Sequence, residues 1–193
     1  MNDAILIAAA LDKHLSAPTE VIVYGAAALL LDAQFAQRLT GRRTNDIDII
    51  IPASRELQID ADRQFWASID VTNRELAPRG LFISHLFPES EVVLSPDWHQ
   101  HLCVMDGPWK KLRVLRPRIL DLILSKMRRG DAADLADVRA MLALARTVQG
   151  GAITPEELTA AANRARVPDS YREIFPHARD RILQIAREAS GSG

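Results

Sequence analysis

One stretch of the chain, residues 21–52, constrains the fold more than any other. A short apolar run at residues 21–24 has the length and composition of a buried strand, and Gly25 interrupts it. Apolar residues at helical spacing then predict a helix over residues 26–38, followed by a polar, basic loop at residues 41–45. After the loop, Asp46-Ile47-Asp48 begins a β-branched run that favours another strand. The predicted order is therefore strand, glycine turn, helix, loop and strand.

Two features of this stretch, the acidic pair and the glycine turn, are typical of a site that binds a metal ion and phosphate. Alternate side chains of a strand share a face, so Asp46 and Asp48 point the same way and repel unless a cation lies between them. Mg²⁺ accepts one or two carboxylates and completes its octahedron with water and phosphate oxygens. Gly25 opens a helix, and the N–H groups at a helix N-terminus favour phosphate. An acidic pair facing a phosphate cradle is what nucleotidyl transfer requires, although an Asp-x-Asp at a strand end is often only a solvated edge.

The glycine, alanine and leucine of the turn, followed by Arg-x-Thr-x-Asp-Ile-Asp, resemble the polymerase β-like nucleotidyltransferase superfamily. The chain is most similar to the bacterial branch that holds the abortive-infection toxins of toxin–antitoxin pairs and related uncharacterised nucleotidyltransferase-like proteins. The resemblance covers roughly residues 20–145. The matching residues are Gly25, Ala28, Leu29, Arg42, Thr44, Asp46 and Asp48.

The resemblance implies roles for the residues of the turn and of the acidic pair. Asp46 and Asp48 are expected to be catalytic and to hold Mg²⁺ (or Mn²⁺), while backbone N–H groups of Gly25 and Ala26 bind the phosphates of an NTP. Many relatives carry serine or glycine where this chain has Ala26. The backbone N–H is kept there, but no hydroxyl can touch a phosphate.

Relatives also carry a third carboxylate, on a strand antiparallel to the Asp-x-Asp strand. By order, that strand is expected at residues 81–87, which contain no Asp or Glu. His85 stands about where the acid is expected, and an imidazole is able to ligate a softer metal or act as a base. The alternative is a structural histidine bonded to backbone. Glu89 and Glu91 are nearby substitutes, although Glu89 falls in the predicted turn.

Further substrate contacts are expected from polar and basic side chains. Arg42 and Thr44 are expected to position their loop or contact phosphate. In the resembling branch a helix bears a lysine, which Lys126 matches, and we expect it to reach a nucleotide phosphate. The residues that follow match more loosely: Arg129, Asp131, Asp134 and Asp137. Because charge runs usually mark ion-paired helices, the alternative for these residues is a salt-bridged helix pair.

The composition is that of an ordinary globular protein. Hydrophobic residues make up 48% and charged residues 25% of 193 residues, and the net charge of −1 gives no overall attraction to nucleic acid. Cys103 is the single cysteine, so an internal disulfide is impossible and a reducing, cytoplasmic location is expected. The N-terminus lacks a basic region, so we expect no signal peptide, and no apolar run approaches the roughly 20 residues of a membrane span.

The predicted fold class is α/β (α+β), with a small mixed sheet flanked by helices. We expect a nucleotidyltransferase core at residues 1–116, a C-terminal helical lobe at 117–189 and a flexible tail at 190–193. The other predicted elements are a helix capped by Asn2 or Asp3 that runs to about Leu15, a helix at 53–66, a polar loop at 71–80, a hairpin of strands 81–87 and 91–94, a strand at 112–115, and later helices capped by Asp131 and Thr154.

These observations lead to a Mg²⁺-dependent nucleotidyltransferase that moves an NMP from an NTP to a hydroxyl acceptor. The acceptor class, whether RNA, protein or a small molecule, is left open, and the resemblance suggests a toxin–antitoxin or phage-defence context with a partner protein encoded alongside. The alternative is a catalytically degenerate relative that acts as a nucleotide sensor or toxin–antitoxin partner. A third hypothesis is a plain protein-interaction domain.

Overall fold

The structure is a computed structural model that describes residues 2–37, 39, 41–147 and 151–191. It divides into two compact units. The first comprises Met1–Glu89 and Leu102–Arg116, and the second comprises Ser90–His101 and Pro117–Gly193. The predicted core of residues 1–116 therefore includes a segment, residues 90–101, that groups with the helices that follow it.

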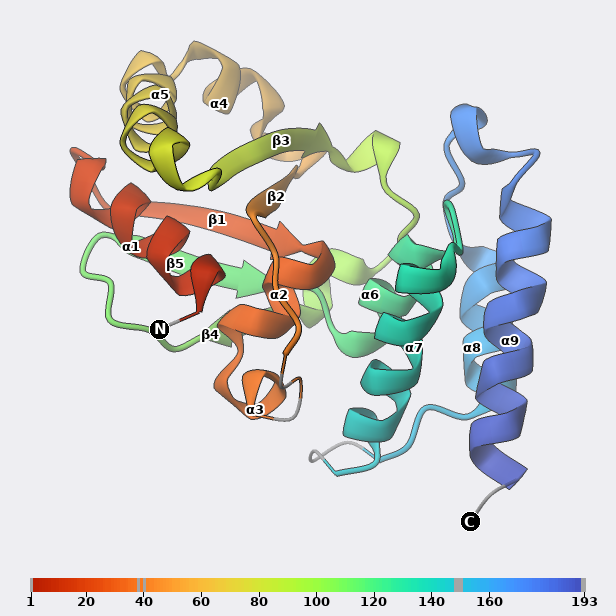
Figure 1. The fold of residues 1–193 in the computed structure, drawn as a ribbon. Coiled ribbons are helices and arrows are strands. Elements are labelled where there is room, and N and C mark those ends of the chain that lie inside the picture. The colour runs from red at the N-terminus through yellow and green to blue at the C-terminus, as the bar shows by residue number, and fades with distance from the viewer. Residues whose placement is uncertain (1, 38, 40, 148–150, 192–193) are drawn as a thin grey trace. The chain divides into compact units, whose positions relative to one another are not determined.

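The first unit is built on a mixed sheet of five strands (Figure 1). The strands are β1 (Thr19–Tyr24), β2 (Asp46–Ile51), β3 (Phe82–Pro88), β4 (Cys103–Met105) and β5 (Leu112–Arg116), in the spatial order β3-β2-β1-β5-β4. β1 pairs antiparallel with β2 and parallel with β5, β2 pairs parallel with β3, and β4 pairs antiparallel with β5. This arrangement, with its helices, confirms the predicted α/β (α+β) class.

Helices α1 (Asp3–His14) and α5 (Arg63–Leu76) contact each other and the sheet of the first unit. As predicted, Asn2 caps α1, and its side-chain oxygen accepts a hydrogen bond from the backbone N–H of Ile5 at 2.9 Å. The shorter helices of this unit are α2 (Gly25–Leu31), α3 (Ala33–Ala36) and α4 (Glu56–Ala61).

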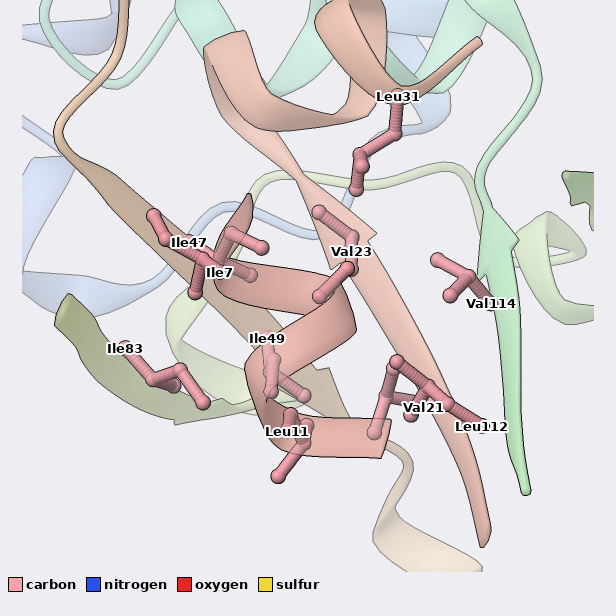
Figure 2. A pocket seen from close by; sticks show the side chains of 11 residues that line it. Ile7, Leu11, Val21, Val23, Leu31, Ile47, Ile49, Ile83, Leu112 and Val114 are labelled. Carbon is pink, nitrogen blue, oxygen red and sulfur yellow. The ribbon is translucent and has the colours of Figure 1, made fainter. Parts of the chain in front are cut away.

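The apolar core of the first unit lies between α1 and one face of the sheet. Ile7 and Leu11 of α1 point toward the side chains of the strands beneath them (Figure 2). The gap between them holds about 10 Å³, the lower limit for one water molecule, and only apolar side chains line it. It is therefore a packing feature of the core. The strand side chains at the gap are Val21, Val23, Ile47, Ile49, Ile83, Leu112 and Val114.

The predicted hairpin of residues 81–87 and 91–94 is wrong. β3 pairs parallel with β2, and after Pro88 the chain turns through a 3-10 segment at Glu89–Glu91 and leaves the sheet. Leu94 instead forms an isolated antiparallel bridge with Arg166. Pro88 and the polar residues after it favour a turn whether the chain forms a hairpin or leaves the sheet. The local sequence therefore does not distinguish these two structures.

The predicted loop at residues 71–80 is also wrong in its first half, because α5 continues to Leu76. Asp62 caps this helix and accepts a hydrogen bond from the backbone N–H of Phe65 at 2.9 Å. The buried residues of α5 recur at helical spacing: Phe65, Ser68, Ile69, Thr72 and Leu76.

The second unit is helical, with α6 (Ile119–Lys126), α7 (Ala132–Ala145), α8 (Pro155–Arg164) and α9 (Phe175–Gly191) (Figure 1). Asp131 and Thr154 cap α7 and α8, as predicted. The predicted flexible tail begins too early, because Ser190 and Gly191 end α9; residues 192–193 lie outside the described residues. Among the described helices, none is both long and apolar enough to cross a bilayer.

Candidate active site

The pairing of β1 with β2 brings the glycine turn to the acidic pair. Because the two strands are antiparallel, the last residue of β1, Tyr24, lies opposite Asp48 near the start of β2. Gly25 follows at once with a φ of +71°, a conformation that L side chains rarely adopt. A Cβ atom built on Gly25 would lie 3.6 Å from Oδ2 of Asp48, so this carboxylate faces the start of α2.

Asp46 and Asp48 share a face of β2, as the sequence predicts. Both are half-buried, whereas Ile47 and Ile49 alternate with them and point into the apolar core beneath α1 (Figure 2). Thr44, in the loop before β2, donates its hydroxyl hydrogen to Oδ1 of Asp46 at 2.9 Å and lies 3.1 Å from the carbonyl oxygen of the same residue. Thr44 is predicted either to position its loop or to contact phosphate, and these two contacts fit the positioning role.

An irregularity in the register brings two residues of β3 to Asp48. Ile47 lies opposite Ile83, but Asp48 lies opposite His85, so Ser84 is an extra residue of the kind found in β-bulges. The Ser84 hydroxyl donates to Oδ1 of Asp48 at 2.6 Å. Nδ1 of His85 lies 3.7 Å from the same oxygen, and the His85 side chain is 68% exposed.

The strand expected to carry the third carboxylate is therefore present, but it runs parallel to the acidic strand and not antiparallel to it. His85 lies beside Asp48, as expected from its position in the sequence. Glu89 follows Pro88, which is paired with Ile51, and it belongs to the 3-10 segment after β3, so it does not lie beside Asp48 in the sheet. Glu91 belongs to the second unit.

The oxygen atoms present suit a single hard cation. Thr44 and Ser84 each occupy Oδ1 of one acid, and no donor among the described residues bonds to Oδ2 of Asp46 or of Asp48. Mg²⁺ binds proteins through one or two such carboxylates and takes its other ligands from water and phosphate. Within the described part of the chain, no three His, Cys, Asp or Glu side chains form a metal-binding group. The donor set therefore fits one Mg²⁺ better than a two-metal site.

The turn that the sequence predicts to bind phosphate differs from the expectation in the length of its helix. The helix predicted over residues 26–38 is split into α2, of seven residues, and α3. The break falls at Asp32, whose Oδ1 accepts from the Gln34 N–H and whose Oδ2 pairs with Arg116 at 2.8 Å. A short helix has a small dipole, so a ligand here would depend on the N–H groups near Gly25 and Ala26 themselves. Arg42 is half-buried in the loop, with its backbone N–H bonded to the Leu39 carbonyl.

Lys126 lies in the second unit and is engaged in ion pairs. Its Nζ atom is 3.0 Å from Oδ1 of Asp134 and 2.8 Å from Oδ2 of Asp137, and both acids are buried on α7. Arg129 also pairs with Asp134, at 3.1 Å. These contacts match the alternative predicted for these residues from the sequence, a salt-bridged pair of helices. A role of Lys126 in phosphate binding stays a prediction.

Sequence reasoning missed Ser84. It precedes His85 directly, but neighbouring residues of a regular strand point to opposite faces, so nothing in the sequence links both to one carboxylate. The link depends on the register shift, which is a property of the pairing between β2 and β3. No local signal in the sequence marks it.

Comparison with known proteins finds a family match. A family described as nucleotidyltransferase of unknown function (DUF6036) matches residues 4–149. That span holds the glycine turn, the acidic pair, β3 and Lys126. No curated protein and no solved structure matches the chain at a significant level.

Proposed function

The chain belongs to this nucleotidyltransferase family of unknown function, and from that premise we propose that it transfers an NMP from an NTP to a hydroxyl acceptor. The observation that carries the proposal is the approach of Asp48 to the turn at Gly25, where Oδ2 faces the first residue of α2 and would lie 3.6 Å from a Cβ atom at that glycine. An acid and a phosphate-binding turn that meet in this way are the two parts that a metal-bound triphosphate needs.

Asp46 and Asp48 are the residues that would hold Mg²⁺ (or Mn²⁺). When bound, such an ion screens the triphosphate charge and lowers the barrier to attack on phosphorus. The N–H groups of Gly25 and Ala26 are suited to donate to phosphate oxygens, because the first N–H groups of a helix lack partners within it. Arg42 supplies positive charge in the loop that leads to Asp46.

His85 is the candidate for removing the proton from the acceptor hydroxyl. Nδ1 lies toward Asp48 at 3.7 Å, and most of the side chain is exposed, so the rest of the ring is open to a substrate. A carboxylate beside an imidazole nitrogen helps to fix the orientation of the ring. His85 and Asp48 together would take the role that the third carboxylate has in relatives.

Label transfer tests the proposal directly. The wild-type chain is incubated with each α-labelled NTP in turn, with Mg²⁺ or Mn²⁺, and with total RNA and lysate as acceptors. We expect label to be transferred by the wild type and lost in Asp46→Asn and Asp48→Asn. Asp60→Asn is the matched control, because Asp60 is an exposed carboxylate on α4. Transfer by the acidic-pair variants at the wild-type rate would rule out the proposed mechanism.

The fate of the label identifies the acceptor. Label that ribonuclease removes lies on RNA, and label that only protease removes lies on protein. The toxin–antitoxin or phage-defence context and the accompanying partner protein remain predictions from the family resemblance. They gain support if an equimolar amount of a protein encoded beside this chain prevents the transfer of label.

A second function is favoured by the missing third carboxylate. Ser84 and His85 stand beside Asp48 on the strand where the resemblance leads us to expect that acid, and a chain that has lost it is able to keep nucleotide binding without turnover. Such a chain would act as a nucleotide sensor or as a toxin–antitoxin partner. Nucleotide binding that requires Mg²⁺ and Asp48, with no labelled product from any NTP, would favour this function over transfer.

A further inference from the structure

The hydrogen bond between Ser84 and Asp48 fixes a carboxylate that would otherwise be free to rotate. The terminal torsion of an aspartate is broad, so packing alone sets the plane of its carboxylate poorly. The Ser84 hydroxyl donates to Oδ1 at 2.6 Å, a distance typical of an O–H group bonded to a charged oxygen. Without this bond, the contact of Oδ1 that remains within the described part of the chain would be His85, at 3.7 Å.

The bond also decides which oxygen of Asp48 is presented to a ligand. With Oδ1 held by Ser84, Oδ2 faces the turn at Gly25. Thr44 acts on Asp46 in the same way, since its hydroxyl donates to Oδ1 and leaves Oδ2 without a donor among the described residues. The two hydroxyls come from different elements, a loop and an edge strand, yet each holds one oxygen of one acid.

The irregular pairing of β2 with β3 is what makes the Ser84 contact possible. In a regular strand, Ser84 and His85 would lie on opposite faces, and only one of them would reach Asp48. The extra residue turns the strand locally, so the hydroxyl and the imidazole approach the same carboxylate. Bulges that re-aim a side chain in this way are found beside active sites.

We infer that Ser84 is a positioning residue for a divalent cation held by Asp46 and Asp48, an inference that rests on the metal site of the proposed function. Residues that orient a metal ligand through a hydrogen bond typically change metal affinity by about 10–100-fold when they are removed. Ser84 itself would touch neither the cation nor the substrate. It acts through the orientation of Asp48.

Mn²⁺ binding, followed by electron paramagnetic resonance of the free ion, tests the inference without any enzymatic assay. The decisive pair is Ser84→Thr and Ser84→Val, which have the same shape and differ in the hydroxyl. We expect Ser84→Thr to bind Mn²⁺ close to the wild-type affinity and Ser84→Val to bind at least about 10-fold more weakly. Ser54→Ala, at an exposed serine of the first unit, is the control and should match the wild type. Circular dichroism establishes that each variant is folded.

The outcomes separate this inference from the proposed function. Equal Mn²⁺ affinity of Ser84→Thr and Ser84→Val would overturn the inference, as would Mn²⁺ binding by the wild type that Asp48→Asn does not weaken. If the wild type binds Mn²⁺ through Asp48 but transfers no label, transfer fails while the role of Ser84 is still decided by the Thr and Val pair.

Discussion

Each oxygen of the Asp48 carboxylate has a different neighbour. Oδ1 accepts the Ser84 hydroxyl hydrogen and lies near His85, whereas Oδ2 faces Gly25. The side chain thus meets β3 on one side and the start of α2 on the other. A change at any of these neighbours alters the carboxylate at the centre of the proposed site.

Gly25→Ala should destabilise the chain through its backbone conformation. The φ of +71° costs an L residue about 1–2 kcal/mol, while the added Cβ would meet Oδ2 of Asp48 only at an ordinary contact distance of 3.6 Å. We expect that loss in the free energy of unfolding measured with urea, together with weaker Mn²⁺ binding.

Gly80→Ala is the matched control for this substitution. Gly80 has a φ of +65°, and a Cβ there would meet nothing within 4 Å. It should lose a similar amount of stability and keep the Mn²⁺ affinity of the wild type. Equal Mn²⁺ affinity in both variants would mean that Gly25 contributes only backbone conformation.

Between elements, a buried ion pair anchors the segment after the glycine turn. Asp32 lies between α2 and α3, and its Oδ2 accepts from Nε and Nη2 of Arg116 on β5, at 3.0 and 2.8 Å. Both side chains are mostly buried, and the Arg116 guanidinium lies over the Phe35 ring. The pair holds Asp32 at the position where the predicted single helix is interrupted.

Asp32→Asn should keep the cap on α3 but leave the Arg116 charge without its carboxylate. Removing one partner of a buried pair is costly, so we expect a loss of about 3 kcal/mol in the free energy of unfolding with urea. Asp180→Asn removes the exposed partner of Arg179 and should cost less than about 1 kcal/mol. Similar losses in the two variants would show that burial of the Asp32 pair has little energetic weight.

The ion pairs between α6 and α7 should make stability depend on pH. Burial acts to raise the pKa of Asp134, but Lys126 and Arg129 outweigh it, so the pKa lies below its ordinary value of 3.8. When folding lowers the pKa of a carboxyl, the ionised group stabilises the native state at any pH above its ordinary pKa. That contribution is lost as the pH falls through the lowered pKa. The chain should therefore lose stability as the pH falls below 3.8.

Asp134→Asn isolates this contribution. The variant should be less stable than the wild type near neutral pH, and its free energy of unfolding should fall less steeply between about pH 5 and pH 3. Urea titrations across that range measure both slopes, and Asp180→Asn should follow the wild type. Parallel pH profiles for wild type and Asp134→Asn would contradict the assignment.

At the scale of the whole molecule, residues 90–101 tie two parts of the sequence into the second unit. The backbone N–H and hydroxyl of Ser95 donate to the fully buried Asp121, and the Leu94 carbonyl accepts from the Arg166 N–H at 3.0 Å. Val92 and Val93 are buried as well. This segment depends on residues that come after Arg116.

A chain truncated after Arg116 should therefore not behave as an independent domain. The buried Val92, Val93 and Leu94 would lose the partners supplied by the second unit, and the exposed apolar segment should cause aggregation during size-exclusion chromatography. Replacing residues 90–101 with a glycine-serine linker should increase the monomeric fraction. Equal monomeric fractions with and without the replacement would show that this segment does not need the second unit.

The features that the sequence predicts well are those governed by local chemistry. The Ile49–Ile51 run gives a strand, and Asn2, Asp131 and Thr154 cap helices because a capping side chain needs only its own N–H partners a few residues later. The spacing from Phe65 to Leu76 is helical too, but the polar residues in its second half favour a loop, and that part of the prediction is wrong.

The features that the sequence does not predict depend on pairing between distant segments. Neither the parallel pairing of β3 with β2 nor the extra residue at Ser84 leaves a local mark, and both determine what lies beside Asp48. The convergence of Asp48 on Gly25 is predictable, because a strand, a turn and an antiparallel return bring those positions together. The sequence thus indicates the acidic pair and its neighbours Thr44 and His85, but it does not indicate Ser84.

The most direct measurement of the proposed metal-nucleotide site is paramagnetic broadening of amide signals by Mn²⁺ in the presence of an NTP. Because the broadening falls steeply with distance, it reports which residues surround the bound ion. We predict that the amides of Gly25, Ala26, Asp46, Asp48 and Ser84 lose intensity first in the wild type and keep it in Asp48→Asn. Broadening that avoids the Gly25 turn, or that persists unchanged in Asp48→Asn, would contradict the claim that this acidic pair and this turn bind one metal-nucleotide.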